Sequence, residues 1–93
     1  MGLRMSNIGL SKEWALRWLR GSIASYMRGK ISLPMLIGRV KRCIESYGVS
    51  PSEVESLAQS IILDPGLMLG GQEERQKVLE PLFNYLRELK KSP

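Results

Sequence analysis

The chain has 93 residues, no histidine and a single cysteine, and its 14 Lys and Arg residues against 9 Asp and Glu give a net charge of +5. This length suits one domain. The missing histidines exclude imidazole acid–base catalysis and the usual Cys/His zinc site, and the single cysteine excludes a disulfide within the chain.

The first predicted helix spans about residues 11–28. Ser11 is a typical N-terminal capping residue, and Gly29 suits the end of a helix. At 100° per residue, one apolar stripe is formed by Leu16, Leu19, Ile23 and Met27. Residues 1–10 precede this helix as an N-terminal arm, and the pattern leaves open whether that arm is ordered.

The second predicted helix spans about residues 33–47, between a capping serine and Gly48. Its apolar stripe consists of Leu33, Leu36, Ile37, Val40, Cys43, Ile44 and Tyr47. The third predicted helix spans about residues 51–63. Ser50 and Glu53 have the spacing of a capping box around Pro51, the strongest local signal in the chain.

The fourth predicted helix spans about residues 72–90, and we expect it to bend or restart near Pro81, which lacks an amide donor. Its expected buried residues are Val78, Leu79, Leu82, Phe83, Leu86 and Leu89. No segment alternates with the period of a strand. The sequence therefore predicts an all-α protein, a compact four-helix bundle in which residues 11–91 form a single helical domain.

The charge is unevenly distributed. Residues 1–50 hold nine basic and two acidic residues, whereas residues 51–93 hold five basic and seven acidic ones. This division indicates two differently used surfaces, or else an excess of cations that only aids solubility. No apolar run is long enough to span a membrane, and one free cysteine suits the cytoplasm. Few amides and five Met residues leave a thermophilic origin open.

The carboxylates form no evident catalytic pair. Most fall on the exteriors of predicted helices, and Glu53 and Glu55, two residues apart, point in different directions. Cys43 lies on an apolar stripe, where a buried, inert thiol is the usual case. We therefore expect a protein that is not an enzyme and has no catalytic residue, no metal site and no cofactor.

Residues 40–61 resemble the helix-turn-helix family of DNA-binding domains, through Tyr47-Gly48-Val49-Ser50 at the turn and through Val54 and Leu57 after it. The resemblance implies that the third helix reads DNA bases. The exposed residues expected on that helix are Ser52, Glu53, Glu55, Ser56 and Gln59. They include no Lys or Arg, and two carboxylates would repel phosphates, so this function is not favoured.

A second resemblance lies in the fourth helix. Gln76, Leu79 and Phe83 resemble the short box with which replication and repair proteins bind the sliding clamp, although Leu82 departs from its aromatic pattern. The resemblance implies a clamp partner. The alternative interpretation is that these apolar residues belong to the core, as their helical spacing also predicts.

Contact with nucleic acid is better supported in the basic half. The predicted nucleic-acid-binding residues are Arg17, Arg20, Arg28, Lys30, Arg39, Arg42, Trp14 and Trp18. Arginine forks suit phosphate oxygens, and two tryptophans one helical turn apart can stack on exposed bases. The alternative is that the indole rings are buried in the core and the arginines are merely solvated.

A protein partner is predicted from apolar residues that the core does not need. They are Met35, Leu63, Leu67, Met68 and Leu69. We therefore expect an accessory or adaptor subunit of a larger intracellular assembly that handles nucleic acid in replication, repair or transcription. Two alternatives stay open: a free-standing, weakly selective DNA- or RNA-binding protein, and a homo-oligomeric structural protein.

Overall fold

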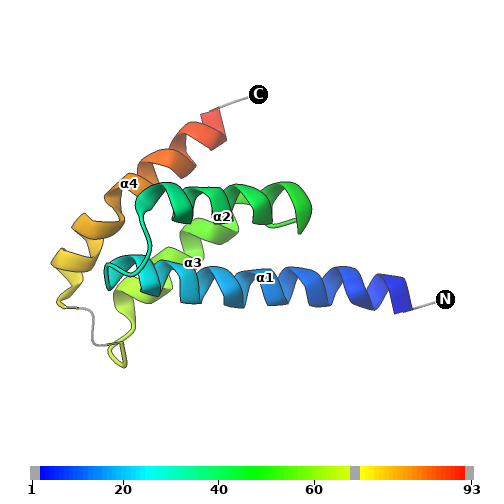
Figure 1. The fold of residues 1–93 in the computed structure, drawn as a ribbon, viewed down its shortest axis with the longest axis horizontal. Helices are drawn as coiled ribbons and strands as arrows, with labels where there is room; N and C mark the ends of the chain where they lie inside the picture. Colours follow the sequence, from blue (N-terminus) through cyan, green and yellow to red (C-terminus); the bar gives the residue numbers. More distant parts are fainter. Residues whose placement is uncertain (1–2, 68–69, 92–93) are drawn as a thin grey trace.

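The computed structural model describes the backbone of residues 3–67 and 70–91 and the side chains of residues 11–67 and 70–91. Its helices are α1 (Leu3–Met27), α2 (Leu33–Ser46), α3 (Pro51–Leu63) and α4 (Gln72–Lys91). The described residues contain no strand, so the predicted all-α four-helix bundle is confirmed. Helices α1 and α2 lie antiparallel, and the other two helices pack on one side of this pair (Figure 1).

Helix α1 is longer than the sequence pattern predicted. It begins at Leu3 rather than near Ser11, so most of the expected N-terminal arm is helical. A serine predicts a helix start only where the residues before it leave the helical conformation, and no proline in this segment forces them to do so. The N-terminal turns of α1 extend beyond the end of α2 (Figure 1).

The predicted caps are present at α2 and α3. The Ser32 hydroxyl accepts a hydrogen bond from the Met35 amide at 3.3 Å. At the start of α3, the Ser50 hydroxyl accepts from the Glu53 amide at 3.1 Å, while the Glu53 carboxylate accepts from the Ser50 amide at 3.0 Å. Gly48 has a positive φ of 70°, which favours glycine in the turn after α2.

One continuous core joins the four helices. Its largest fully buried side chains are Leu19, Ile23, Leu36, Val40, Cys43, Val54, Ile61, Leu79, Leu82 and Leu86. Val78, which the sequence placed on the buried stripe of α4, is instead 39% exposed. It lies at the edge of that stripe, where the Tyr26 hydroxyl donates to its carbonyl at 3.2 Å without covering its side chain.

Helix α4 continues through Pro81 to Lys91 and does not restart there. Pro81 is exposed. The resemblance to a clamp-binding box does not correspond to an accessible motif, because Leu79, Leu82 and Phe83 are buried in the core. The interpretation of these residues as core residues is therefore confirmed.

Arg75 stabilises the connection between α3 and α4, a role that was not predicted from the sequence. Only 5% of this residue is exposed. Its guanidinium donates to the carbonyls of Ile61, Ile62, Asp64, Leu67 and Gly70. These bonds satisfy carbonyls that have no partner inside α3, so one cation closes the C-terminus of a helix and orders the turn after it.

Candidate nucleic-acid interface

Two rows of side chains run along the open face of the α1–α2 pair. On α1 the row contains Trp14, Arg17, Trp18, Gly21 and Ser25, with Arg28 directly after the end of the helix, and on α2 it contains Met35, Arg39, Arg42 and Ser46. Steps of three and four residues keep each row on one side of its helix. We call these ten residues the α1–α2 surface. It contains no Asp or Glu.

The two rows meet at a cluster of aromatic rings. The rings of Trp14 and Trp18 are stacked, with centroids 5.5 Å apart and an angle of 18° between their planes. Tyr47, which follows α2, lies 5.7 Å from Trp14 with its ring tilted by 50°. Trp14 is still 52% exposed, whereas Trp18 is half-buried and packs against the core. One tryptophan therefore supports the other, which remains open to a partner.

Arg39 fixes the position of this aromatic pair. Its guanidinium carbon lies 5.4 Å from the centroid of the Trp18 ring, within the range of a cation–π contact. One of its nitrogens also donates to the hydroxyl of buried Ser22 at 2.9 Å, and that hydroxyl donates to the Trp18 carbonyl at 2.8 Å. This closed set of contacts holds Trp18 and restricts Arg39 to one orientation.

The predicted cations divide into engaged and available ones. Arg20 forms an ion pair with Asp64 at 2.6 Å and lies within 3.4 Å of the Ser60 hydroxyl, so it ties α1 to α3. The side chains of the exposed cations Arg17, Arg28, Lys30 and Arg42 form no hydrogen bond or ion pair with another described residue. The structure thus leaves a smaller cationic set than the sequence suggested. Arg17 lies three residues after Trp14 on α1, whereas Arg28 and Lys30 follow the end of that helix.

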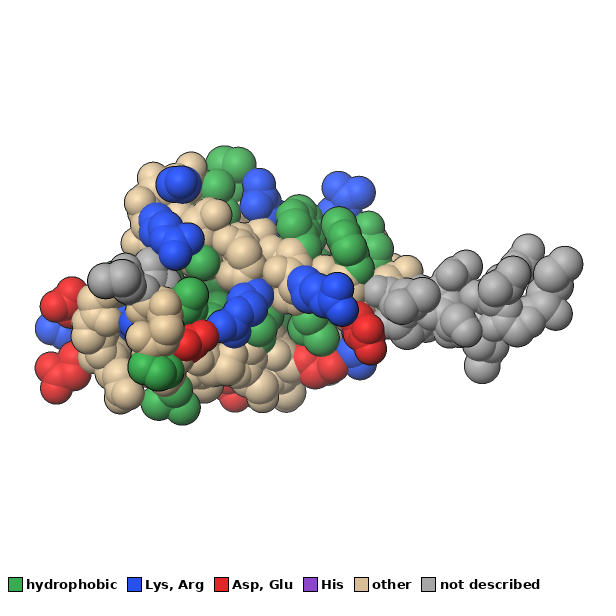
Figure 2. All heavy atoms as spheres, turned by 90° about the horizontal axis from the view of Figure 1, so that it is seen from below, with side chains coloured by type: hydrophobic (Ala, Val, Ile, Leu, Met, Phe, Trp, Pro, Cys, Tyr) green, Lys and Arg blue, Asp and Glu red, His purple; other side chains and the backbone are tan. Residues whose placement is uncertain are grey.

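Figure 2 shows basic side chains spread along one face of the molecule, with apolar side chains between them. Acidic side chains in this view lie mainly toward the lower part and one end of the body. A surface of unpaired arginines with an exposed indole can neutralise phosphates and contact bases, whereas the opposing carboxylates of α3 are already paired. Those pairs are Lys12 with Glu53 at 2.9 Å and Lys90 with Glu55 at 3.0 Å.

The predicted partner residues do not form one patch. Met35 is 50% exposed on the α1–α2 surface, and Leu63 is 61% exposed at the end of α3, as expected. Leu67 is half-buried and packs against the core, whereas Met68 and Leu69 lie outside the described residues. Leu63 borders a groove of about 440 Å³ between α3 and α4, which is also lined by Gln59, Ile62, Gln72, Glu73, Gln76 and Lys77.

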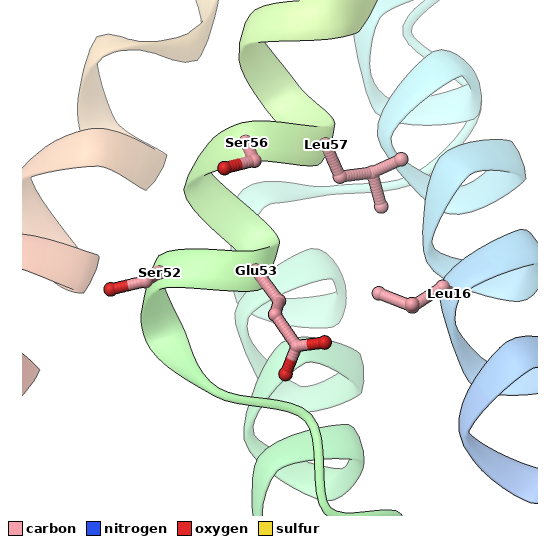
Figure 3. Close-up of a pocket in the computed structure, with 5 residues that line it drawn as sticks. All are labelled: Leu16, Ser52, Glu53, Ser56 and Leu57. Carbon is pink, nitrogen blue, oxygen red and sulfur yellow. The ribbon is translucent and has the colours of Figure 1, made fainter. Parts of the chain in front are cut away.

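A second groove, of about 390 Å³, lies between α1 and α3. Figure 3 shows Leu16 and Leu57 pointing toward each other across it, while Ser52 and Ser56 point away from α1. Its one carboxylate, Glu53, already accepts from the Ser50 amide and pairs with Lys12, which keeps the pKa of Glu53 below its ordinary value. The groove offers one carboxylate and two hydroxyls but no second acid or base for proton transfer.

The arrangement of α2 and α3 differs from that of a DNA-reading motif. Helix α2 packs mainly on α1, whereas α3 packs on α4 and α1.

Cys43 is fully buried, and burial raises the pKa of its thiol while nearby Arg42 opposes that effect. Among the described residues, no three His, Cys, Asp or Glu side chains come together as a metal site would require. In the same part of the chain, no helix has the length and hydropathy of a membrane span.

Comparison of the chain with models of protein families, with curated proteins and with solved structures gave no match.

Proposed function

We propose that this protein is a non-enzymatic nucleic-acid-binding module that acts as an accessory subunit, and that it contacts nucleic acid through the α1–α2 surface. The observation that carries the proposal is the combination, on one face, of an exposed tryptophan with arginines that have no protein partner. Phosphates supply the complementary charge, and guanidinium groups bind phosphate oxygens through paired hydrogen bonds.

The available cations set the expected salt dependence. If Arg17, Arg28, Lys30 and Arg42 each neutralise one phosphate, the logarithm of the binding constant should fall against the logarithm of salt concentration with a slope of about −4 for duplex DNA. For single strands the corresponding slope is about −3. Fluorescence anisotropy of labelled oligonucleotides between 50 and 300 mM salt measures both slopes. Over this range a slope of about −4 lowers the binding constant by roughly three orders of magnitude.

A matched pair of variants tests the location of the site. Replacing Arg17 and Arg42 by Ala should reduce the magnitude of the slope by about 2, because each residue accounts for about one phosphate. The control replaces Lys77 and Arg87 by Ala and removes the same charge. Both are exposed cations on α4, and neither side chain pairs with another described residue. Equal effects of the two double variants would show only general attraction to a basic protein and would refute the assignment of this surface.

An acidic protein is the competing kind of partner for the same surface. Polyglutamate competes for cations but offers neither phosphate oxygens nor base rings. We expect it to displace labelled nucleic acid much more weakly than unlabelled nucleic acid does at equal charge. Equal competition would favour an acidic protein partner over nucleic acid.

The accessory role is a further part of the proposal and is supported by Leu63. An exposed leucine beside a groove rimmed by amide side chains offers an apolar contact with polar groups around it, as protein interfaces do. Sedimentation of the protein and of a Leu63→Glu variant separates the alternatives. A dimer that the substitution converts to a monomer would assign this surface to a second copy of the chain rather than to a different subunit.

A further inference from the structure

Resting on the proposed function, we infer that the nucleic acid is single-stranded and that Trp14 is the residue on which an unpaired base stacks. The shape of the α1–α2 surface does not suit the groove of a duplex. A major groove about 12 Å wide admits one α-helix. Two helices packed side by side, each about 10 Å across with axes about 9 Å apart, present a face about 19 Å wide, which exceeds the width of the groove by about half. The aromatic and basic residues are distributed over both helices, so the face as a whole cannot enter a duplex groove.

The two indole rings differ in how accessible they are to a base. Base stacking needs an accessible aromatic face, and in a duplex the faces of the bases are already stacked on their neighbours. Trp18 is unsuitable because Trp14 covers it from one side and the Arg39 guanidinium lies over its ring. Trp14 has Trp18 stacked on one face and Tyr47 tilted against it, yet 52% of this residue remains exposed to solvent. An unpaired base is the partner that this exposed indole fits.

The ring of Trp14 is already held in place before a ligand binds. Its contacts with Trp18 and Tyr47 restrict the ring before any ligand arrives. A side chain fixed in this way loses little conformational entropy on binding, so more of the stacking energy contributes to affinity. Arg39, with one nitrogen committed to Ser22, is likewise oriented beside the aromatic pair. Trp18 and Arg39 act as positioning residues for the stacking ring.

The cationic row extends along the whole described length of the surface. Arg28, the first residue after α1, lies 14 residues after Trp14 and keeps the helical hydrogen bond to Ala24, so the two are about 21 Å apart along the helix axis. Arg17 lies between them, and Arg42 flanks the row from α2. An extended strand that stacks one base on Trp14 can therefore pass its phosphates over several arginines in succession.

The test compares a single-stranded oligonucleotide of 20 bases with the blunt duplex of the same sequence, for the parent protein and two variants. We expect the parent to bind the single strand more tightly and its tryptophan fluorescence to be quenched on binding. Trp14→Ala should weaken single-strand binding about 5- to 100-fold, leave duplex binding within about 2-fold and leave the salt slope unchanged. Trp14→Phe should retain most of the affinity, because a phenyl ring can still stack.

Circular dichroism of each variant checks that the bundle remains folded, as expected for a half-exposed side chain. Equal loss of single-strand and duplex binding, or no loss, in a folded Trp14→Ala variant would overturn the stacking inference. In that case a salt slope that still depends on Arg17 and Arg42 would leave the proposed function standing. No binding to either nucleic acid at 50 mM salt would overturn both.

Discussion

Arg75 offers the sharpest test of how the fold is held together. Its side chain is almost completely buried, and it reaches five carbonyls at the end of α3 and in the following turn. The nitrogen Nη1 has two hydrogens for three of these carbonyls, so four bonds form at one time. We predict that Arg75→Met, which keeps an apolar stem but removes every donor, destabilises the protein strongly.

The size of the effect follows from which carbonyls lose their donor. The carbonyls of Ile61 and Asp64 also accept from the amides of Asp64 and Leu67, at 3.3 and 3.4 Å. Those of Ile62, Leu67 and Gly70 have no other donor among the described bonds outside the helices, but Gly70 is exposed and water can replace the guanidinium there. Leaving two such acceptors without a partner costs about 1–3 kcal/mol each, so we expect a loss of about 3 kcal/mol in the free energy of unfolding.

Urea unfolding followed by far-ultraviolet circular dichroism measures this loss. With a slope of about 1.5 kcal/mol per molar urea, the midpoint should fall by about 2 M. Arg87→Met on the same helix is the matched control, because Arg87 is exposed, and it should change the free energy by less than about 0.5 kcal/mol. A loss below about 1 kcal/mol for Arg75→Met, or equal losses for the two variants, would show that water replaces the guanidinium and that the reasoning is wrong.

Three further predictions concern single residues. Gly21→Ala and Gly38→Ala should each raise the free energy of unfolding by about 0.5–1 kcal/mol in urea titrations, because an added methyl meets no atom within 4 Å; weaker nucleic-acid binding by the first variant alone would indicate close approach of the ligand at Gly21. Cys43 should react with iodoacetamide far more slowly in the native protein than in urea, since its thiol is buried and its pKa is raised, and rapid native labelling would contradict this. Glu53→Gln keeps the cap but removes the charge that Lys12 stabilises. Because the folded pKa of Glu53 lies below 4.5, the difference in the free energy of unfolding between parent and variant should be present above that pH and shrink as pH falls through the folded pKa. A difference that grows in acid would refute the predicted direction of the pKa shift.

The ends of the helices show how far local signals extend. The cap at Ser50 was predictable because its donors and acceptors lie within three residues of one another. The cap predicted at Ser11 was wrong, since a continuing helix upstream leaves no free amides for that serine to satisfy. The same residue type thus signals a helix start only when the preceding backbone departs from the helical conformation.

The burial of Arg75 could have been predicted from its spacing. Arg75 precedes Leu79 by four residues and Leu82 by seven, which puts it on the buried side of α4. A cation on an apolar stripe needs partners, and the chain before it offers the free carbonyls at the end of α3. Which carbonyls it binds depends on the path of residues 64–70, which sequence spacing does not specify.

The amino-acid sequence by itself determined the four helices, most of the core and the concentration of positive charge in the first half of the chain, because these depend on local periodicity and composition. Only the tertiary structure decided which cations remain available. Arg17 and Arg20 lie three residues apart on the same side of α1. Arg20 nevertheless forms an ion pair with Asp64, from a distant part of the chain, while Arg17 stays in solvent. It likewise decided that Trp18 is covered by Arg39 and that Trp14 is exposed, since both outcomes depend on how α2 packs against α1.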